Sequence, residues 1–171
     1  MAHSVQETQR QLIACALEVL ADAGFALAGS GAIREHGMTQ RPTNDIDLFT
    51  VIQASTRFPH AVDSLIEHLT ANDYDVTIER VSPSFAQFSV TPPHGVPLSV
   101  DLAIDWRAHT PVRLDVGPVL DIEDAVGKNC ALCTPGATPA TISTSMRSAP
   151  PERSAMRASS SSFRNATQAS T

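Results

Sequence analysis

The sequence is poor in positive charge and in long apolar runs, and both shortages exclude classes of protein. Residues 1–127 contain no lysine, and 7 arginines stand against 17 aspartates and glutamates, a net charge of −10. An acidic body repels polyanions, so binding one would need a bound cation or a basic partner surface. No apolar run approaches the roughly 18 residues of a membrane span. The first residues lack the basic and apolar regions of a signal peptide, so we expect a cytoplasmic protein with no membrane part.

Cysteine is also scarce, and histidine is scattered. Cys15, Cys130 and Cys133 are odd in number, which argues against a disulfide framework. Cys130 and Cys133 form a lone CxxC without a second pair or a nearby histidine. Zinc needs about four ligands, so free thiols are expected. The six histidines show no ligand spacing, and His36 is interpreted as a helix-surface residue.

What is present is a regular alternation of helical and strand patterns over residues 1–127. Apolar spacing predicts helices over 7–23, 32–36 and 61–69, a helix starting near 121–126, and strands over 25–28, 46–49, 74–81, 84–91 and 97–104. This order favours an α/β (α+β) domain with a mixed sheet flanked by helices.

The composition changes after Val126. Residues 134–171 consist largely of Ser, Thr, Ala, Pro and Arg, and residues 128–171 carry a net charge of +4. Such a segment cannot bury enough apolar surface to fold alone. We therefore expect a core over 1–127 and a disordered C-terminal tail over 128–171.

Asp45 and Asp47 begin a predicted strand, with one residue between them. Side chains two residues apart on a strand point to the same face, so the two carboxylates converge. Neighbouring carboxylates repel each other, and a divalent cation resolves that conflict. Mg²⁺ is typically held by one or two carboxylates together with phosphate oxygens. A D-x-D pattern alone is common and most often marks a solvated strand end, so its context decides.

The segment before this strand supplies that context. Gly29-Ser30-Gly31 stands where a predicted strand meets a helix, and glycine lets a phosphate approach the backbone beside free helix N–H groups. Alone it would be an ordinary turn. Followed by a polar loop and a D-x-D strand, it forms a far rarer combination. In that loop Arg41 is a candidate triphosphate clamp, or else forms a surface salt bridge, and Thr43 either orients the loop, meets substrate or is a simple cap.

Asp101 is the third candidate carboxylate. It stands inside the otherwise apolar segment Leu98 to Ile104. A buried carboxylate needs partners, and two aspartates that hold a metal would provide one. Asp105 is the alternative, but it falls at the end of the strand, where pairing with Arg107 is the simpler reading.

These residues carry a resemblance to a known family. The segment from Phe25 to Gly37, followed by Arg41 to Phe49, closely resembles the abortive-infection toxin nucleotidyltransferases (the AbiEii/AbiGii toxin group) of the DNA polymerase β-like superfamily. The family pattern is a Gly-Gly/Ser turn, a short helix and then R-x-[ST]-x-D-[IL]-D-[LF]. The match covers roughly residues 10–127.

The resemblance implies a nucleotidyltransferase that moves a nucleoside monophosphate from an NTP to an acceptor, with Mg²⁺ (or Mn²⁺) as cofactor. In some relatives the acceptor is the 3′ end of tRNA. It also implies an antitoxin partner, metal binding by Asp45, Asp47 and Asp101, and phosphate binding by Gly29 and Ser30. Thr43 matches the hydroxyl residue that precedes the aspartates in relatives.

The chain departs from the family after Val126. Gly127-Lys128-Asn129 inverts the expected Asn-Lys, and the family's R-D-x-x-D stretch is missing. The genetic code permits a shifted reading of residues 128–147 that contains this stretch. A one-base deletion near codon 128, in the gene or in its sequencing, is therefore our hypothesis, and resequencing the DNA tests it. Two further interpretations are a catalytically inactive remnant that only binds nucleotide or an antitoxin, and an ordinary α/β domain with incidental carboxylates.

Overall fold

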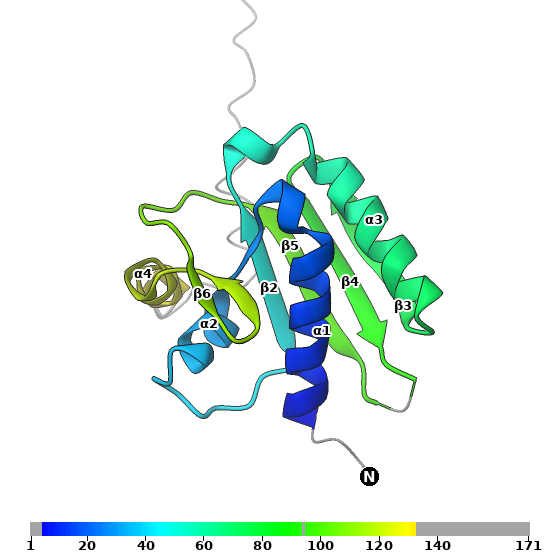
Figure 1. The fold of residues 1–171 in the computed structure, drawn as a ribbon, viewed down its shortest axis with the longest axis horizontal. Coiled ribbons are helices and arrows are strands. Elements are labelled where there is room, and N and C mark those ends of the chain that lie inside the picture. Colours follow the sequence, from blue (N-terminus) through cyan, green and yellow to red (C-terminus); the bar gives the residue numbers. More distant parts are fainter. Residues whose placement is uncertain (1–4, 94, 133–171) are drawn as a thin grey trace, which may run out of the picture. The chain divides into compact units, whose positions relative to one another are not determined.

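The computed structural model describes residues 5–93 and 95–132. Within these residues, helices alternate with the strands of one sheet (Figure 1). The helices are α1 (Val5–Val19), α2 (Gly29–Glu35), α3 (Phe58–Ala71) and α4 (Ile122–Leu132). The strands are β1 (Ala26–Leu27), β2 (Asp45–Thr50), β3 (Asp75–Ser82), β4 (Phe85–Thr91), β5 (Leu98–Ile104), β6 (Val112–Leu114) and β7 (Gly117–Val119). Short 3-10 helices cover Ala21–Ala23 and Ile52–Ala54.

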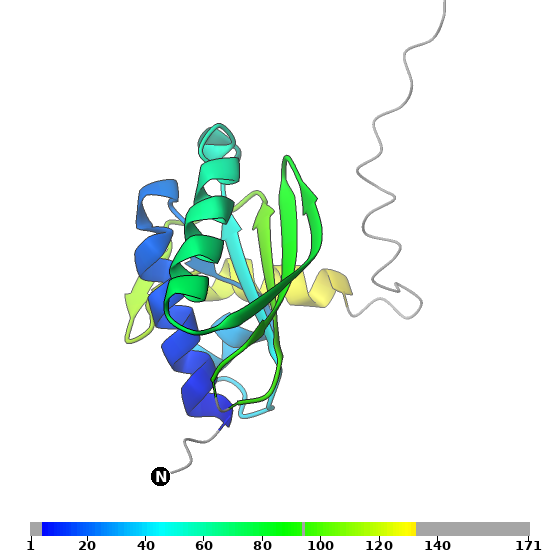
Figure 2. The same ribbon diagram turned by 90° about the vertical axis from the view of Figure 1, so that its right-hand side faces the viewer.

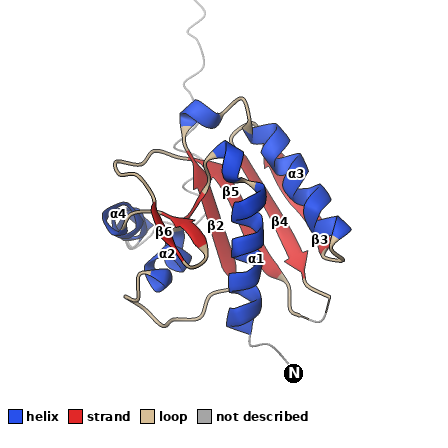
Figure 3. Cartoon of the chain, in the orientation of Figure 1, coloured by secondary structure: helices blue, strands red, loops and turns tan. Residues whose placement is uncertain are grey.

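The seven strands of the described residues form a mixed sheet in the order β3-β4-β5-β2-β1-β7-β6. The pairs β2–β5 and β1–β7 are parallel, and the other four pairs are antiparallel. The predicted fold class, a mixed sheet with flanking helices, is confirmed (Figure 3).

One face of the sheet carries the hydrophobic core. Alternate residues of the central strands are buried, with Ile46 and Leu48 on β2 and Val100 and Leu102 on β5 at 1% exposure or less. Strand side chains alternate between faces, so the residues between these ones point to the opposite face. α1 and α3 cover the buried face (Figure 2). The aspartates therefore lie on the face away from α1 and α3.

α1 forms because its apolar residues recur at helical spacing, and the buried ones, among them Leu12, Ile13 and Leu17, face the sheet. It ends at Val19, before the predicted end at residue 23, because the chain tightens into the 3-10 helix Ala21–Ala23. Gly24 follows with φ +66°, a left-handed conformation that favours glycine.

The largest addition to the predicted elements is the hairpin β6–β7. Its strands have three residues each, too few to show a periodic pattern. β7 is held in the sheet by pairing with β1, where Leu27 is aligned with Val119. α2 also begins earlier than predicted, at Gly29.

The C-terminal part of the described region is α4, which continues to Leu132. Asp124 near its start accepts hydrogen bonds from the backbone N–H groups of Ala108 (3.1 Å) and His109 (2.9 Å), so it ties the loop after β5 to α4. The division of the chain at residue 127 stays a prediction, and the expected tail lies mostly outside the described residues. No helix in the described ranges is long and apolar enough to cross a membrane.

Candidate active site

The three predicted acidic residues come together on two neighbouring strands. β2 and β5 run parallel, and their register aligns Asp47 with Asp101. Asp45 precedes Asp47 by two residues on β2, so its side chain leaves the sheet on the same side. All three carboxylates thus project from the face of the sheet that α1 and α3 leave open.

Burial and the closeness of these carboxylates raise the pKa values of Asp47 and Asp101. The pKa of Asp47 is raised to about 6, first by burial and then by the charges of Asp101 and Asp45. Burial also raises the pKa of Asp101, and the charges of Asp45 and Glu79 add to the rise. Raised carboxylate pKa values in such a cluster mark a place where a cation would be stabilised.

Asp101 is held by two neighbours. Gln87, directly across from it on β4, donates a hydrogen bond from Nε2 to Asp101 Oδ1 at 3.0 Å. The Ser99 hydroxyl donates to the same oxygen at 3.5 Å. These two bonds favour the ionised carboxylate and oppose the rise of its pKa. Both act on Oδ1, so within the described residues neither engages Oδ2.

The segment formed by Gly29, Ser30 and Gly31, here called the glycine corner, lies directly against Asp47. Gly29 has φ +59°, and a Cβ atom added to it would stand 2.0 Å from Asp47 Oδ2. The backbone N–H of Ala28 donates to the carbonyl of Asp47 at 2.8 Å, which fixes the corner to β2. Ser30 follows as the second residue of α2 and is partly buried. The corner therefore needs glycine both for its backbone angle and for room beside the carboxylate.

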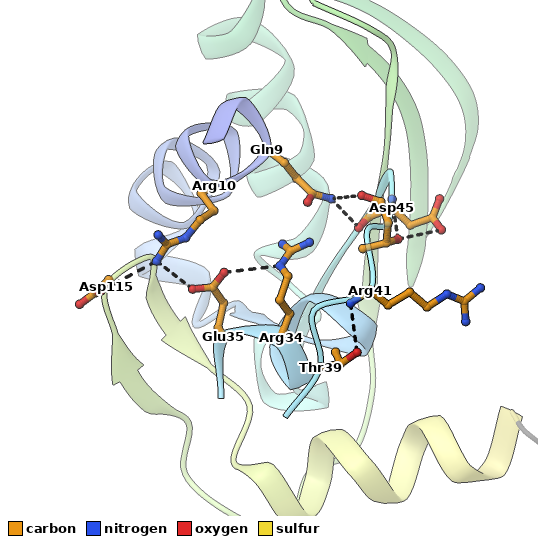
Figure 4. Close-up of polar contacts among 9 residues, drawn as sticks. Gln9, Arg10, Arg34, Glu35, Thr39, Arg41, Asp45 and Asp115 are labelled. Carbon is orange, nitrogen blue, oxygen red and sulfur yellow. Dashed lines mark hydrogen bonds and ion pairs between the residues drawn. The ribbon is translucent and has the colours of Figure 1, made fainter. Parts of the chain in front are cut away.

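The loop before β2 is fixed from two sides (Figure 4). Thr43 Oγ1 accepts the backbone N–H of Asp45 at 3.1 Å and lies 3.4 Å from Asp45 Oδ2. Gln9 of α1 is 1% exposed, and its Nε2 donates to the carbonyls of Thr43 (3.0 Å) and Asp45 (3.2 Å). Arg41 is exposed. Thr43 therefore caps β2 and also touches the first carboxylate.

The donor set fits a hard divalent cation, since three carboxylates repel one another on one face and oxygen is the ligand that Mg²⁺ prefers. The oxygen atoms are nevertheless spread. Within residues 5–93 and 95–132, no group of three or more His, Cys, Asp or Glu side chains is arranged to hold a metal ion. Metal binding would therefore require the carboxylates to turn toward a common point.

Two residues of the site escaped sequence reasoning, Gln9 and Gln87. A single amide in a helix or strand gives no signal, because its role depends on which backbone or carboxylate the fold places beside it. The alternative carboxylate, Asp105, lies beyond the end of β5, and its Oδ1 accepts the N–H of Trp106 at 2.7 Å. The interpretation of His36 as a surface residue is incomplete, since its Nε2 lies 2.9 Å from the carbonyl oxygen of Leu120.

Solved structures share the fold. JHP933 from Helicobacter pylori is 18% identical with a TM-score of 0.53, over 79% of this chain and 60% of that one. A candidate nucleotidyltransferase from H. pylori is 18% identical with a TM-score of 0.51, over 80% of this chain and 63% of that one. The chain thus spans less than two thirds of either protein.

The sequence was also compared with curated proteins and with models of protein families. A search of curated proteins found no match. The sequence model of the family described as "Nucleotidyl transferase AbiEii toxin, Type IV TA system" matches residues 11–144, which include the glycine corner and all three aspartates. The chain therefore belongs to the AbiEii nucleotidyltransferase toxin family.

Proposed function

We propose that this protein transfers a nucleoside monophosphate from an NTP to the 3′ end of tRNA, with Mg²⁺ (or Mn²⁺) as cofactor. The alignment of Asp47 with Asp101, beside the corner at Gly29, carries the proposal. Membership of the family supports nucleotidyl transfer in general. The acceptor and the metal are our inference.

Each predicted residue has a role in this proposal. Asp45, Asp47 and Asp101 would hold the metal, because their carboxylates share one open face. Gly29 and Ser30 would approach the phosphates of the NTP with backbone N–H groups at the start of α2. Arg41, exposed on the loop before β2, would bind the triphosphate through its guanidinium. Thr43 keeps Asp45 in place through two contacts.

The reaction forms a bond between the acceptor hydroxyl oxygen and the α-phosphorus of the NTP, and pyrophosphate leaves. A bound metal supplies charge neutralisation and activation of the hydroxyl. Asp101 is our candidate to take the hydroxyl proton, since Gln87 and Ser99 both contact its Oδ1 and neither contacts Oδ2.

The test is transfer of label. The full chain is incubated with each labelled NTP, Mg²⁺ and total tRNA, beside Asp45→Ala and the exposed helix variant Asp63→Asn as a matched control. We expect label on tRNA with the wild type and Asp63→Asn and none with Asp45→Ala. Equal labelling by Asp45→Ala would exclude the proposed site.

The inactive remnant is the competing function, and the same assay addresses it with a protein in which the reading frame after residue 127 is restored. Transfer by the restored protein alone would support the remnant, which would then bind only nucleotide or an antitoxin. We further propose an antitoxin protein as partner, from the family description, and the cytoplasm, where NTP and tRNA occur, as the location.

A further inference from the structure

The open face of β2, β5, β4 and β3 is organised in rows that run across the strands. One row aligns Asp47, Asp101, Gln87 and Arg80, through the register of each neighbouring pair. Aligned side chains in a sheet lie on the same face and next to each other. The row therefore leads from two carboxylates, through an amide, to a guanidinium at the edge of the sheet.

The rows on either side differ in chemistry. Toward the start of β2, the register aligns Asp45, Ser99, Ser89 and Thr77, so that a carboxylate is followed by three hydroxyl groups. On the other side it aligns Phe49, Ala103, Phe85 and Ser82, which is mainly apolar. Hydroxyl, amide and aromatic groups together suit a ligand that has sugars, phosphates and bases.

Arg80 is positioned by its neighbours in this face. Its guanidinium carbon lies 6.0 Å from the centroid of the Phe85 ring, a cation–π contact that holds it over the sheet. None of the ion pairs found among the described residues involves Arg80. Its donors are therefore available to an anion.

The other arginines of the described residues do not share this position. Arg34 is buried, and Arg10 pairs with Glu35 at 3.0 Å. Arg57 and Arg107 donate to the backbone carbonyls of Asp22 and Gly24, Arg41 lies in the loop before β2, and Arg113 lies on β6, the opposite edge strand.

We propose that Arg80, stacked on Phe85, binds a backbone phosphate of a single-stranded nucleic-acid acceptor that lies across β5, β4 and β3. The inference rests on the proposed transfer and names the chemistry by which the acceptor is recognised. Arg80 stands two strands from Asp101, roughly 10 Å at the usual strand spacing. The terminal hydroxyl would then reach the carboxylates while the next phosphate meets the guanidinium.

The acidic surroundings restrict where on this face a phosphate can bind. Asp45, Asp47 and Asp101 repel phosphate, and Glu79 at the bulge of β3 lies close enough to act on Asp101. A nucleic-acid strand that crosses this face therefore meets a favourable place for its phosphate at Arg80. Such a surface accepts a chain end in one direction only, with the hydroxyl toward β2.

The test is binding of a fluorescent single-stranded RNA with a free 3′ hydroxyl to the full chain, measured by anisotropy over a range of salt concentrations. Arg80→Gln is compared with Arg113→Gln, which removes the same charge from the opposite edge strand. We expect Arg80→Gln to weaken binding roughly tenfold, as for one lost charged hydrogen bond. It should also reduce the slope of log K against log salt by about 0.7. Arg113→Gln should change neither, and Arg80→Lys should keep the slope.

Equal effects of Arg80→Gln and Arg113→Gln, or no RNA binding by the wild type, would overturn the inference. Circular dichroism and the affinity for Mg-NTP are measured for each variant, and we expect both to be unchanged in Arg80→Gln. RNA binding that depends on Arg80 without any transfer of label would uphold the inference and refute the proposed function. Transfer to RNA that is indifferent to Arg80 would do the reverse.

Discussion

Replacing Gly29 by alanine tests two requirements of the glycine corner: its left-handed backbone angle and the lack of room for a side chain beside Asp47. The new Cβ would stand 2.0 Å from Asp47 Oδ2 and 2.8 Å from its carboxyl carbon. The easiest relief is rotation of the carboxylate, because it is the end of a side chain. The variant should therefore fold but carry Asp47 in the wrong position.

The stability change has a size that can be worked out. A residue other than glycine in the left-handed region costs about 1–2 kcal/mol, and Gly29 has φ +59°. For a domain of this size that lowers Tm by several degrees. Gly37→Ala is the matched control, since Gly37 has φ +77° and a Cβ there meets nothing within 4 Å. Both variants should lose similar stability.

Function should distinguish the two variants. We expect Gly29→Ala to lose at least tenfold in label transfer and in Mn²⁺ affinity, followed by electron paramagnetic resonance, because one of three carboxylates is displaced. Gly37→Ala should keep both. If Gly29→Ala binds Mn²⁺ and transfers label as the wild type does, or if Gly37→Ala loses both equally, the reasoning about the corner is wrong.

Two further predictions concern Asp47 and Gln9. Asp47→Asn should abolish transfer yet stabilise the metal-free protein at pH 7.5 by about 1–3 kcal/mol. The pKa of Asp47 is about 6 in the folded protein, against 3.8 ordinarily, so the wild type loses stability as pH rises between these values. Thermal unfolding should show the difference at pH 7.5 and not at pH 3.5, and a less stable variant at pH 7.5 would contradict it. Gln9→Met should cost about 1–3 kcal/mol in urea unfolding, because two buried carbonyls lose their donor, whereas the exposed Gln11→Met should change stability by less than about 0.5 kcal/mol. Equal losses in the two variants would show that the amide contributes nothing specific.

The sequence predicted the parts of the fold and site that depend on local periodicity. The alternation in β2 placed Asp45 and Asp47 on one face, since that follows from the strand geometry alone. Whether Asp101 joins them depends on the order and register of β2 and β5, which no local pattern determines. The parallel pairing confirmed that all three lie on the same face. The convergence on one metal stays a prediction.

Elements that depend on partners could not be predicted in this way. β6 and β7 are three residues each, and they exist as strands because β7 adds to β1. The contacts of Gln9 link residues 34 and 36 positions apart, so they arise only when α1 packs on the sheet. The proposed role of Arg80 likewise depends on the residues aligned with it across the sheet. Without them, an arginine on an edge strand would be interpreted as a solvated surface residue.

The short helix α2 has a further consequence for control of the protein. Its first residue stands against Asp47, and at its other end His36 contacts the carbonyl of Leu120, just before α4. α2 also packs against α4, and at roughly 10 Å in length it is too short to absorb a displacement by bending. A molecule that shifts α4 would therefore also move the glycine corner, and with it the backbone that stands against the Asp47 carboxylate.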